Sequence, residues 1–414
     1  MIRLHYEVEK HVIKKSNYLW FCCDDICFRS KNLYNSTLYL IRQYFFKTGK
    51  FLKYNDAYKV FVQENNPDYY AMNTKVSQHV MQLVEQNFKS FFAKLKKCKD
   101  GSNKIPKYLD KLNGRQVAHF SNQAFSFNTR TVPDGYIKLS GTDIIFKTKV
   151  ENPTFVEVKR DSTGNYLILV GYKVDDAEFV ENGNYASIDL GVNNLATLTF
   201  LDTAPIIING KPLKSINQFY NKELAKLQSR QSLSKDKHRR TARMNRLTSN
   251  RNNKINDYMH KASRYIVNQL VSNGVSKLII GYNKCWKQGT NFGDANNQNF
   301  IQIPFLKFIK MLTYKCADLG IAVVLCEESY TSKSSFLDHD DIPTYGKDDT
   351  NFKPSGHRKY RGLYVSKDKI TINADVNGSL NILRKYLKEA ENTDIYDLVN
   401  LVEVCSTPMV FTIK

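Results

Sequence analysis

The hydrophobic pattern of the first 100 residues predicts one strand followed by a group of helices. Ile2, Leu4 and Tyr6 alternate with polar residues, as in a half-buried strand. Apolar residues then recur at intervals of three and four, which is the spacing of an amphipathic helix. The predicted helices cover 18–46, 54–63 and 73–97.

Between residues 105 and 182 the pattern changes to short strands separated by Gly, Asn, Asp or Pro. Several short strands with such turns are typical of a small β-barrel. The strand before the helices is expected to join it, so the helices would be an insertion into the first loop of the barrel. The predicted strands are 117–127, 136–139, 143–146, 154–160 and 166–172.

From residue 185 onward, strands and helices alternate, which predicts an α/β domain. A long helical stretch at 214–271 follows the first three strands, and a strand–helix unit at 370–387 comes late in the chain. About forty polar residues without periodicity precede that unit and are expected to form a solvated loop or mobile lid. The predicted strands are 185–190, 195–200, 205–209, 277–282 and 321–326, and a further helix begins at Pro304.

The net charge of the chain indicates the class of molecule that it binds. The chain has 61 Lys and Arg against 40 Asp and Glu, a formal net charge of +21, together with 25 Tyr and 24 Phe. Basic residues interleaved with aromatic rings suit phosphate contacts and base stacking, so nucleic acid is the expected partner. A merely soluble basic surface is the alternative reading of the composition.

The basic charge is concentrated at 227–254, where nine Lys or Arg accompany a single acid, Asp236. As a solvated helix face this segment would repel itself, so it is interpreted as a hairpin that contacts a polyanion.

The eight cysteines contain no C-x-x-C pair, and several lie in or beside apolar runs. They are expected to be buried, reduced thiols in a cytosolic protein. No apolar run reaches the ~20 residues of a membrane helix, and the polar N-terminus does not resemble a secretory signal. We therefore expect no membrane partner.

Carboxylates lie at the ends of two strands and at the start of one helix of the second region. Asp189 lies in the first strand, the strand 321–326 runs directly into Glu327 and Glu328, and Asp375 lies in the first turn of the last helix. An isolated acid in an apolar strand is costly to bury unless a cation or hydrogen bonds compensate it. Three such acids suit a two-metal phosphodiesterase site with Mg²⁺ or Mn²⁺. Three unrelated surface acids are the alternative.

Several motifs resemble the TnpB family of transposon-encoded nucleases, which is related to Fanzor proteins and to type V CRISPR effectors. The nuclease motifs are IDLGVNNLAT, GYNKCWKQ, NNQNFIQIPF, EESYTSKSSFLD and INADVNGSLNILRK. Outside them, the resemblance includes NLYNSTLYLIRQ, NFKSFFAKLK, KIPKYLDKLNGRQVAHFSNQAFS and INQFYNKELAKLQS. The similarity extends over nearly the whole chain in matching order.

This resemblance implies an RNase H-like RuvC domain after an N-terminal β-barrel (wedge) domain with an inserted helical recognition domain. The barrel would comprise 1–12 and 105–182, the recognition domain 13–104, and the RuvC domain 183–414. The RuvC domain would contain a long helical insertion at about 212–273 and a lid, or degenerate zinc ribbon, at about 330–370.

The resemblance also implies a function. The chain would be an RNA-guided DNA endonuclease in the prokaryotic cytosol, active as a monomer or dimer in a ribonucleoprotein. A guide RNA from the transposon end would pair with double-stranded target DNA beside a short transposon-adjacent motif. Two Mg²⁺ or Mn²⁺ ions held by Asp189, Glu328 and Asp375 would support hydrolysis of the phosphodiester bonds.

The chain departs from the family at the second acid. The usual glutamate would fall in LIIGYN, where this chain has Gly281. Either the nuclease is inactive, as in a guided repressor, or the glutamate has moved to Glu328, and the second interpretation is preferred. Glu328 is favoured over Glu327, because alternation would direct Glu327 to the opposite face if the strand stayed regular.

Family members often carry a four-cysteine zinc ribbon before the last aspartate. Residues 332–371 contain no cysteine, so no structural zinc is expected.

Contact residues follow from the resemblance and from the basic charge. Rough alignment to family contacts suggests Lys75, Gln78, Asn122 and Gln123 for reading the DNA motif. The arginines expected at the backbone of the guide–target duplex are Arg239, Arg240, Arg243, Arg246 and Arg251. A compact CRISPR effector shares this chemistry and remains an alternative, whereas a strand-transferring transposase fits the motifs less well.

Overall fold

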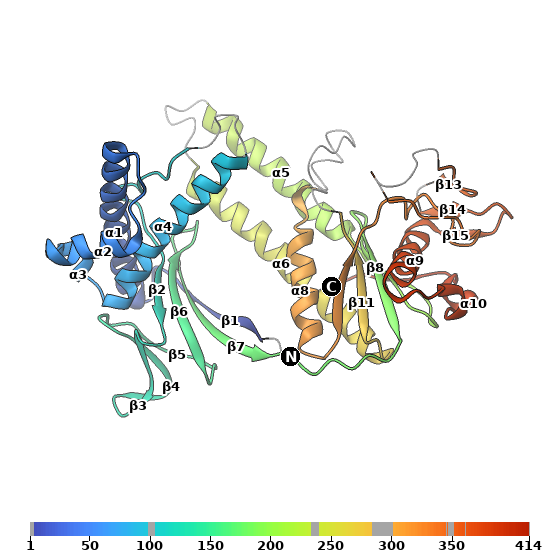
Figure 1. The fold of residues 1–414 in the computed structure, drawn as a ribbon, viewed down its shortest axis with the longest axis horizontal. Helices are drawn as coiled ribbons and strands as arrows, with labels where there is room; N and C mark the ends of the chain where they lie inside the picture. The colour runs from blue at the N-terminus through green and yellow to red at the C-terminus, as the bar shows by residue number, and fades with distance from the viewer. Residues whose placement is uncertain are drawn as a thin grey trace. The chain divides into compact units, whose positions relative to one another are not determined.

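The computed structural model describes residues 4–97, 104–232, 240–283, 301–344, 346, 352–360 and 362–413. The chain divides into an N-terminal unit, Leu4–Val174, and a C-terminal unit that contains Asp175–Lys414. Figure 1 shows the two units, each with its own layers of helices and strands.

The N-terminal unit begins with a strand and then forms helices, as the pattern predicts. The helix expected at 73–97 is α4, and its buried residues Val76, Val80 and Val84 recur every four positions. A short helix that the pattern did not indicate begins after Asn66, whose side-chain oxygen accepts hydrogen bonds from the backbone N–H groups of Asp68 and Tyr69. The elements are β1 (Leu4–Ile13), α1 (Leu19–Thr48), α2 (Tyr54–Gln63), α3 (Pro67–Tyr70) and α4 (Thr74–Lys97).

The strands of this unit pair in two sheets, ordered β1-β7-β6-β2 and β3-β4-β5. The single strand expected at 117–127 is wrong. The N–H of Ala124 bonds to the carbonyl of Ser121 and closes a turn that separates β2 from β3. The helices and both sheets share one hydrophobic core, and the closed barrel stays a prediction. The strands are β2 (Ala118–Ser121), β3 (Phe125–Thr129), β4 (Val132–Leu139), β5 (Ile145–Lys147), β6 (Pro153–Arg160) and β7 (Tyr166–Asp175).

A six-stranded sheet forms the centre of the C-terminal unit, in the order β12-β11-β8-β9-β10-β16. Strands β12, β11 and β8 are parallel, whereas β9 is antiparallel to both β8 and β10. The C-terminal strand β16, which the sequence pattern did not indicate, pairs with β10 at one edge. The strands of this sheet are β8 (Tyr185–Leu190), β9 (Asn194–Thr199), β10 (Ile206–Asn209), β11 (Lys277–Gly281), β12 (Ala322–Cys326) and β16 (Met409–Phe411).

Helices cover both faces of this sheet (Figure 1). Ala186, Ile188 and Leu190 of β8 pack in one core with residues of α6 and α8. Tyr185 and Ile279 pack in a second core with α9 on the opposite face. Because side chains alternate along a strand, Asp189 and Gly281 belong to the α9 face. The helices are α5 (Lys211–Ser232), α6 (Ala242–Ser272), α8 (Phe305–Ala317), α9 (Ala374–Tyr386) and α10 (Leu401–Val404), with a π-turn at Leu387–Glu391 and a 3₁₀ turn at Ile395–Asp397.

The expectation of a solvated loop before the last helix is wrong for its first part. Ser334, Ser335 and Phe336 are fully buried. Asn377 of α9 accepts a hydrogen bond from the Phe336 N–H and donates to the Ser334 carbonyl. The second part forms a small sheet of β13 (His357–Tyr360), β14 (Leu363–Val365) and β15 (Thr371–Asn373). Hydrogen bonds to the asparagines of α9, which lack any apolar signal, explain why periodicity did not reveal this packing.

No helix in the described part of the chain is both long enough and apolar enough to cross a membrane. The cysteines described by the structure are free, and burial raises the pKa of Cys23, Cys316 and Cys326 to about 12, so they stay protonated thiols.

Candidate metal centre

The three predicted acids come from three adjacent elements of the C-terminal unit. Asp189 is in β8, next to the β11 strand that ends at Gly281. Gly281 pairs with Cys326 of β12, and Glu328 follows two residues later. Parallel strands end at the same edge of a sheet, so Asp189 and Glu328 reach the same end of β11 from its two sides. Asp375 lies in the first turn of α9, which covers this face.

Glu328 occupies the space above the glycine. A Cβ added to Gly281 would lie 2.7 Å from Oε2 of Glu328 and 2.5 Å from Cδ1 of Ile382. Only glycine leaves this space free, and the carboxylate from the neighbouring strand fills it. The prediction that an acid after β12 replaces the missing one on β11 therefore has a geometric basis.

One stripe of α9 runs along all three acids. Asp375 is itself an acid of the site, and Gly378, one turn later, lies beside Asp189, since a Cβ at 378 would be 2.9 Å from Oδ2 of that aspartate. Ile382 follows another turn later and packs against the Gly281 position under Glu328. Residues spaced by three and four share one helix face, so a single helix sets the positions of all three carboxylates.

Buried hydroxyls fix the distance between this helix and the sheet. The Ser187 hydroxyl donates to the Ser379 carbonyl at 2.7 Å and lies 2.7 Å from Oγ1 of Thr199, which in turn lies 2.9 Å from Oγ of Ser379. All three side chains are fully buried. Ser187 precedes Asp189 by one pleat of the strand, and Ser379 follows Asp375 by one helical turn. The hydroxyl contacts therefore hold the elements that carry the two aspartates in register.

Asp375 has two side-chain partners that the sequence did not reveal. Its Oδ2 accepts a hydrogen bond of 2.6 Å from Nδ2 of Asn194, at the start of β9. Its Oδ1 forms an ion pair of 3.0 Å with the Arg358 guanidinium of β13. The side-chain oxygen of Asn373 caps the helix N-terminus by accepting from the N–H of Asp375 and of Val376. Polar type alone does not distinguish Asn194 or Arg358 from their polar neighbours in sequence.

The acids are electrostatically coupled. Burial, followed by the charges of Glu328 and Asp375, raises the pKa of Asp189 well above its ordinary range. Burial, followed by the charge of Glu327, raises the pKa of Glu328 to about 7. Negative charges brought together in a poorly solvated place are unfavourable unless a cation neutralises them. The arrangement is one that a bound cation would stabilise.

The donor set fits a hard divalent cation. The three groups are carboxylates, and the nearby Cys326 keeps its proton, so this cysteine offers no thiolate. Among the described residues, the ligand atoms of the three acids do not all fall within 4.8 Å of one another. A set that shares two ions about 4 Å apart does not need such close spacing.

Glu327 lies elsewhere than its sequence position suggested. Strand β12 ends at Cys326, so the alternation of side chains does not extend to Glu327. Its Oε1 accepts a hydrogen bond of 2.8 Å from the N–H of Ser329, and its Oε2 forms an ion pair with Lys385 of α9. The expectation that Glu327 points to the opposite face required a strand regular to its end, and this condition is not met because a turn follows Cys326.

The residues suggested for reading the DNA motif lie close together in the N-terminal unit. Lys75 is exposed near the start of α4, and Asn122 and Gln123 are exposed in the turn between β2 and β3. The Ser140 N–H donates a hydrogen bond to the carbonyl of Ala124, which follows Gln123. The next residue, Gly141, lies beside the start of α4, because a Cβ added to it would be 3.8 Å from the backbone nitrogen of Asn73. Gln78 is half-buried on α4. Any role in DNA contact stays a prediction.

The arginines suggested for the duplex backbone differ in environment. Arg243 and Arg246 are exposed on α6. Arg240 bonds to Asn245 and Thr248 within the same region. Arg251 is engaged inside the unit, where it donates to Oδ1 of Asn217 at 2.8 Å and to the carbonyl of Gln302 at 2.8 Å. Arg239 lies outside the described residues.

Comparisons with known proteins agree with this architecture. A family model described as a probable transposase, OrfB of IS605, matches residues 166–287. A second model, the TNB domain of Cas12f1-like proteins, matches residues 305–382. The two models thus cover the strands β8 and β11 and the segment from α8 into α9.

Two relatives align in sequence. The TnpB-like protein ORF457 of Acidianus two-tailed virus is 24% identical over 406 residues, which cover 86% of this chain and 81% of that protein. The CRISPR-associated endodeoxyribonuclease Cas12f2 of Micrarchaeota archaeon (strain CG1_02_47_40) is 28% identical over 253 residues. That match spans 56% of this chain and 43% of the relative.

A solved structure has a similar fold. The protein in a Cas12f1–sgRNA–target DNA complex superposes with a TM-score of 0.54 at 14% identity, covering 87% of this chain and 81% of the other. At this identity the likeness concerns the mixed α/β fold alone. Taken with the transposase and TNB matches and with the TnpB-like relative, it leads to one assignment. The comparisons together support a TnpB family protein.

Proposed function

We propose that this protein is an RNA-guided DNA endonuclease whose nuclease site consists of Asp189, Glu328 and Asp375. The observation that carries the proposal is the position of Glu328, whose carboxylate fills the space above Gly281 beside Asp189. An intact set of acids is what a nuclease needs and what an inactive binding protein has no need to keep.

The side chains have distinct tasks in this proposal. Asp189 and Glu328, at the end of β11, would hold the cations, and Asp375 would complete the site from the first turn of α9. Asn194 donates to Asp375 and so fixes the direction of its free lone pairs. When bound, Mg²⁺ or Mn²⁺ supplies the activation of water and the stabilisation of the leaving oxygen in phosphodiester hydrolysis. Zinc has no part in the proposed site.

We further propose that the partners are a guide RNA and a double-stranded target. The known relatives carry this idea, because one is named an endodeoxyribonuclease and a similar fold was solved with sgRNA and target DNA. The exposed basic residues of α5 and α6 supply the positive charge such partners need. The exposed basic residues in and between these two helices include Lys222, Lys226, Arg230, Arg240, Arg243, Arg246 and Lys254.

The test begins with the chain purified together with the RNA expressed from its own locus. That complex, with Mg²⁺, should linearise a plasmid that carries a matching target beside a randomised flanking sequence. The variants Asp189→Ala, Glu328→Ala and Asp375→Ala should each lose cleavage while keeping RNA and target binding. If Glu328→Ala cuts as well as the wild type, the assignment of the site is wrong.

Two other functions follow from specific observations. Gly281 in place of the usual acid would suit a guided repressor, which would bind its target and leave it uncut. The similarity to Cas12f2 would suit a CRISPR effector. Sequencing the co-purifying RNA distinguishes a transposon-end guide from a repeat-derived crRNA, and the plasmid assay distinguishes a nuclease from a repressor.

A further inference from the structure

Two adjacent glutamates follow β12, and they have different partners. The Glu328 carboxylate lies over Gly281 within the acid cluster. The Glu327 carboxylate pairs with the Lys385 ammonium group. A shift of the chain by one residue would put one glutamate in the place of the other, so a specific contact must determine which glutamate enters the metal centre.

Lys385 continues the stripe of α9 that carries the site. It follows Ile382 by three positions, and Ile382 is the residue that packs against the Gly281 position under Glu328. The Lys385 side chain is only 2% exposed. One turn of α9 therefore contacts both glutamates, with the Ile382 side chain at Glu328 and the Lys385 ammonium group at Glu327.

The ion pair favours one arrangement of the two glutamates, because a buried ammonium group needs an acid beside it. The Oε2 atom of Glu327 pairs with Lys385 and its Oε1 atom accepts the Ser329 N–H at 2.8 Å, so both oxygens of this carboxylate are engaged. If Glu328 took the place of Glu327, the lysine would neutralise the acid that the metal needs.

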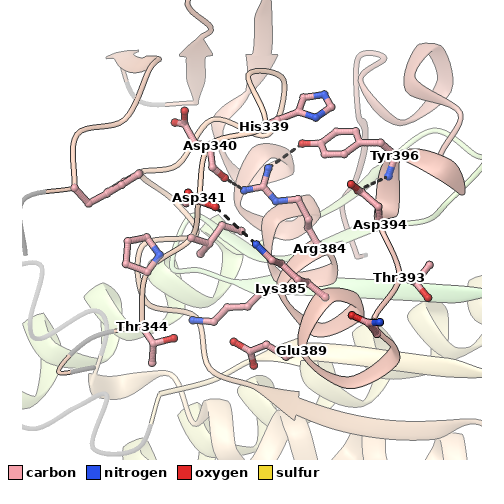
Figure 2. A pocket seen from close by; sticks show the side chains of 15 residues that line it. His339, Asp340, Asp341, Thr344, Arg384, Lys385, Glu389, Thr393, Asp394 and Tyr396 are labelled. Carbon is pink, nitrogen blue, oxygen red and sulfur yellow. Dashed lines mark hydrogen bonds and ion pairs between the residues drawn. The ribbon is translucent and has the colours of Figure 1, made fainter. Parts of the chain in front are cut away.

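Lys385 also lines a cavity of about 1080 Å³ together with Arg384, His339 and Tyr396 (Figure 2). In Figure 2 both basic side chains project from α9 at the wall of this cavity. The Arg384 guanidinium is held by the Tyr396 hydroxyl at 2.8 Å and by the Asp340 carbonyl. Without the lysine ammonium group, Glu327 would lose its ion-pair partner on α9 and keep only the Ser329 N–H.

We propose that Lys385 is a positioning residue, which anchors Glu327 to α9 and thereby directs Glu328 into the metal centre. This inference rests on the proposed nuclease function. In this proposal Lys385 contacts neither the cations nor the nucleic acid, and it affects the metal centre only through the turn at residues 327–328.

The test compares Lys385→Met with a matched control, Lys277→Met. Lys277 is also a buried lysine of this unit, paired with Glu181 at 2.7 Å and Glu391 at 2.9 Å, but it lies at the opposite end of β11 from Gly281. Both variants lose a buried charge and its ion pairs, and both should unfold at a lower temperature. Only the first should affect the metal centre.

Mn²⁺ binding to the purified protein, measured by calorimetry, is the main readout, and target cleavage by the ribonucleoprotein is the second. Lys385→Met should weaken Mn²⁺ binding and slow cleavage by about 10–100-fold, the usual range for residues that orient metal ligands. Lys277→Met should leave the Mn²⁺ affinity and the cleavage rate within about twofold of the wild type. Lys385→Arg keeps the positive charge and should retain most of the wild-type affinity and rate. Glu327→Gln combined with Lys385→Met should be no worse than Lys385→Met alone, since both changes break one contact.

The outcomes separate the two proposals. If Lys385→Met lowers the unfolding temperature as Lys277→Met does but binds Mn²⁺ and cuts like the wild type, the positioning role is wrong and the nuclease stands. If the wild-type protein neither binds Mn²⁺ nor cuts a matched target, the nuclease proposal is overturned, and the positioning role with it.

Discussion

Glu328 follows β12, and Gly281 ends the neighbouring parallel strand β11. The Glu328 carboxylate occupies the space that a side chain at position 281 would fill. The Glu328 Oε2 atom would be 2.7 Å from a Cβ at position 281. The acid is therefore supplied from one strand over and reaches the end of β11 through the gap that glycine leaves. The glycine is part of the site, although it has no side chain to contribute.

This relationship predicts the effect of Gly281→Ala. The methyl group would displace the ends of two flexible side chains, Glu328 and Ile382, so the protein should still fold. Cleavage and Mn²⁺ affinity should fall by about 10–100-fold, as for other displaced metal ligands. The exchange Gly281→Glu with Glu328→Gly returns the acid to β11 and should recover part of the cleavage that Gly281→Glu alone loses. Full cleavage by Gly281→Ala would contradict the proposed geometry.

The ion pair between Arg358 and Asp375 predicts competition with the metal. Both side chains are partly exposed, at 46% and 29%, so the pair is screened and contributes at most about 1 kcal/mol. Arg358→Gln should therefore tighten Mn²⁺ binding to the RNA-free protein by about two- to fivefold. Lys359→Gln removes the same charge from the adjacent exposed position and should change the affinity less. Equal effects of the two variants would mean that only overall charge matters.

The segment before the last helix should be held by hydrogen bonds and not by a metal. Asp340 accepts from the N–H groups of Ser335 at 2.8 Å and Ser355 at 3.0 Å, and from the Ser355 hydroxyl at 2.5 Å. Asp340→Ala should cost about 1–3 kcal/mol by leaving these donors unpaired. Hydrogen exchange of residues 331–341 measures this loss, and Asp341→Ala is the control, since the Asp341 side chain is 90% exposed. Chelators should leave the exchange rates unchanged, and faster exchange in EDTA would reveal a structural metal.

Acid should destabilise the N-terminal unit through His79. Burial, and then the neighbouring His119, lowers the pKa of His79 to about 4, and the two rings stack with centroids 4.0 Å apart. The unfolded chain binds a proton near pH 6.5 and the folded chain does not, so stability falls as the pH drops from about 7 to 4 and levels off below that. Allowing for the partial exposure of the ring, the loss should be about 1–3 kcal/mol.

Denaturant unfolding at pH 7.5 and pH 5 measures this dependence. His79→Phe keeps an aromatic ring against His119 and removes the titration, so its stability should vary less between the two pH values. His357→Phe, at an exposed position, should retain the wild-type dependence. An unchanged dependence in His79→Phe would assign the acid sensitivity to another group.

The basic helices should divide into arginines that bind nucleic acid and arginines that hold the fold. Replacing both Arg243 and Arg246 with Gln removes exposed charges, and should lower the salt-dependence slope of duplex binding by about 2 with little effect on unfolding. Arg251→Gln should do the reverse, because its guanidinium bonds to Asn217 and to the Gln302 carbonyl. Filter binding at several salt concentrations, with thermal unfolding in parallel, distinguishes the two sets.

The sequence by itself determined the elements that carry the chemistry. The strand around Asp189, the strand before Glu328 and the helix with Asp375 in its first turn all lie where the apolar periodicity placed them. Periodicity of this kind reflects burial against a sheet or helix, which is a local property of the chain. The net charge predicted a nucleic-acid partner, and the motifs predicted a family that the comparisons support.

The tertiary structure alone decided how those elements meet. It placed Glu328 over Gly281, paired Glu327 with Lys385 in a turn where strand alternation no longer applies, and brought Arg358 to Asp375. These partners are 47, 58 and 17 residues apart in sequence and show no common periodicity. Contacts at the ends of strands depend on the packing of one helix against a whole sheet, which no local pattern encodes. For the same reason the sequence did not reveal the buried asparagines of α9. The hydrogen bonds of Asn377 hold residues 334–336, which the sequence had suggested were solvated.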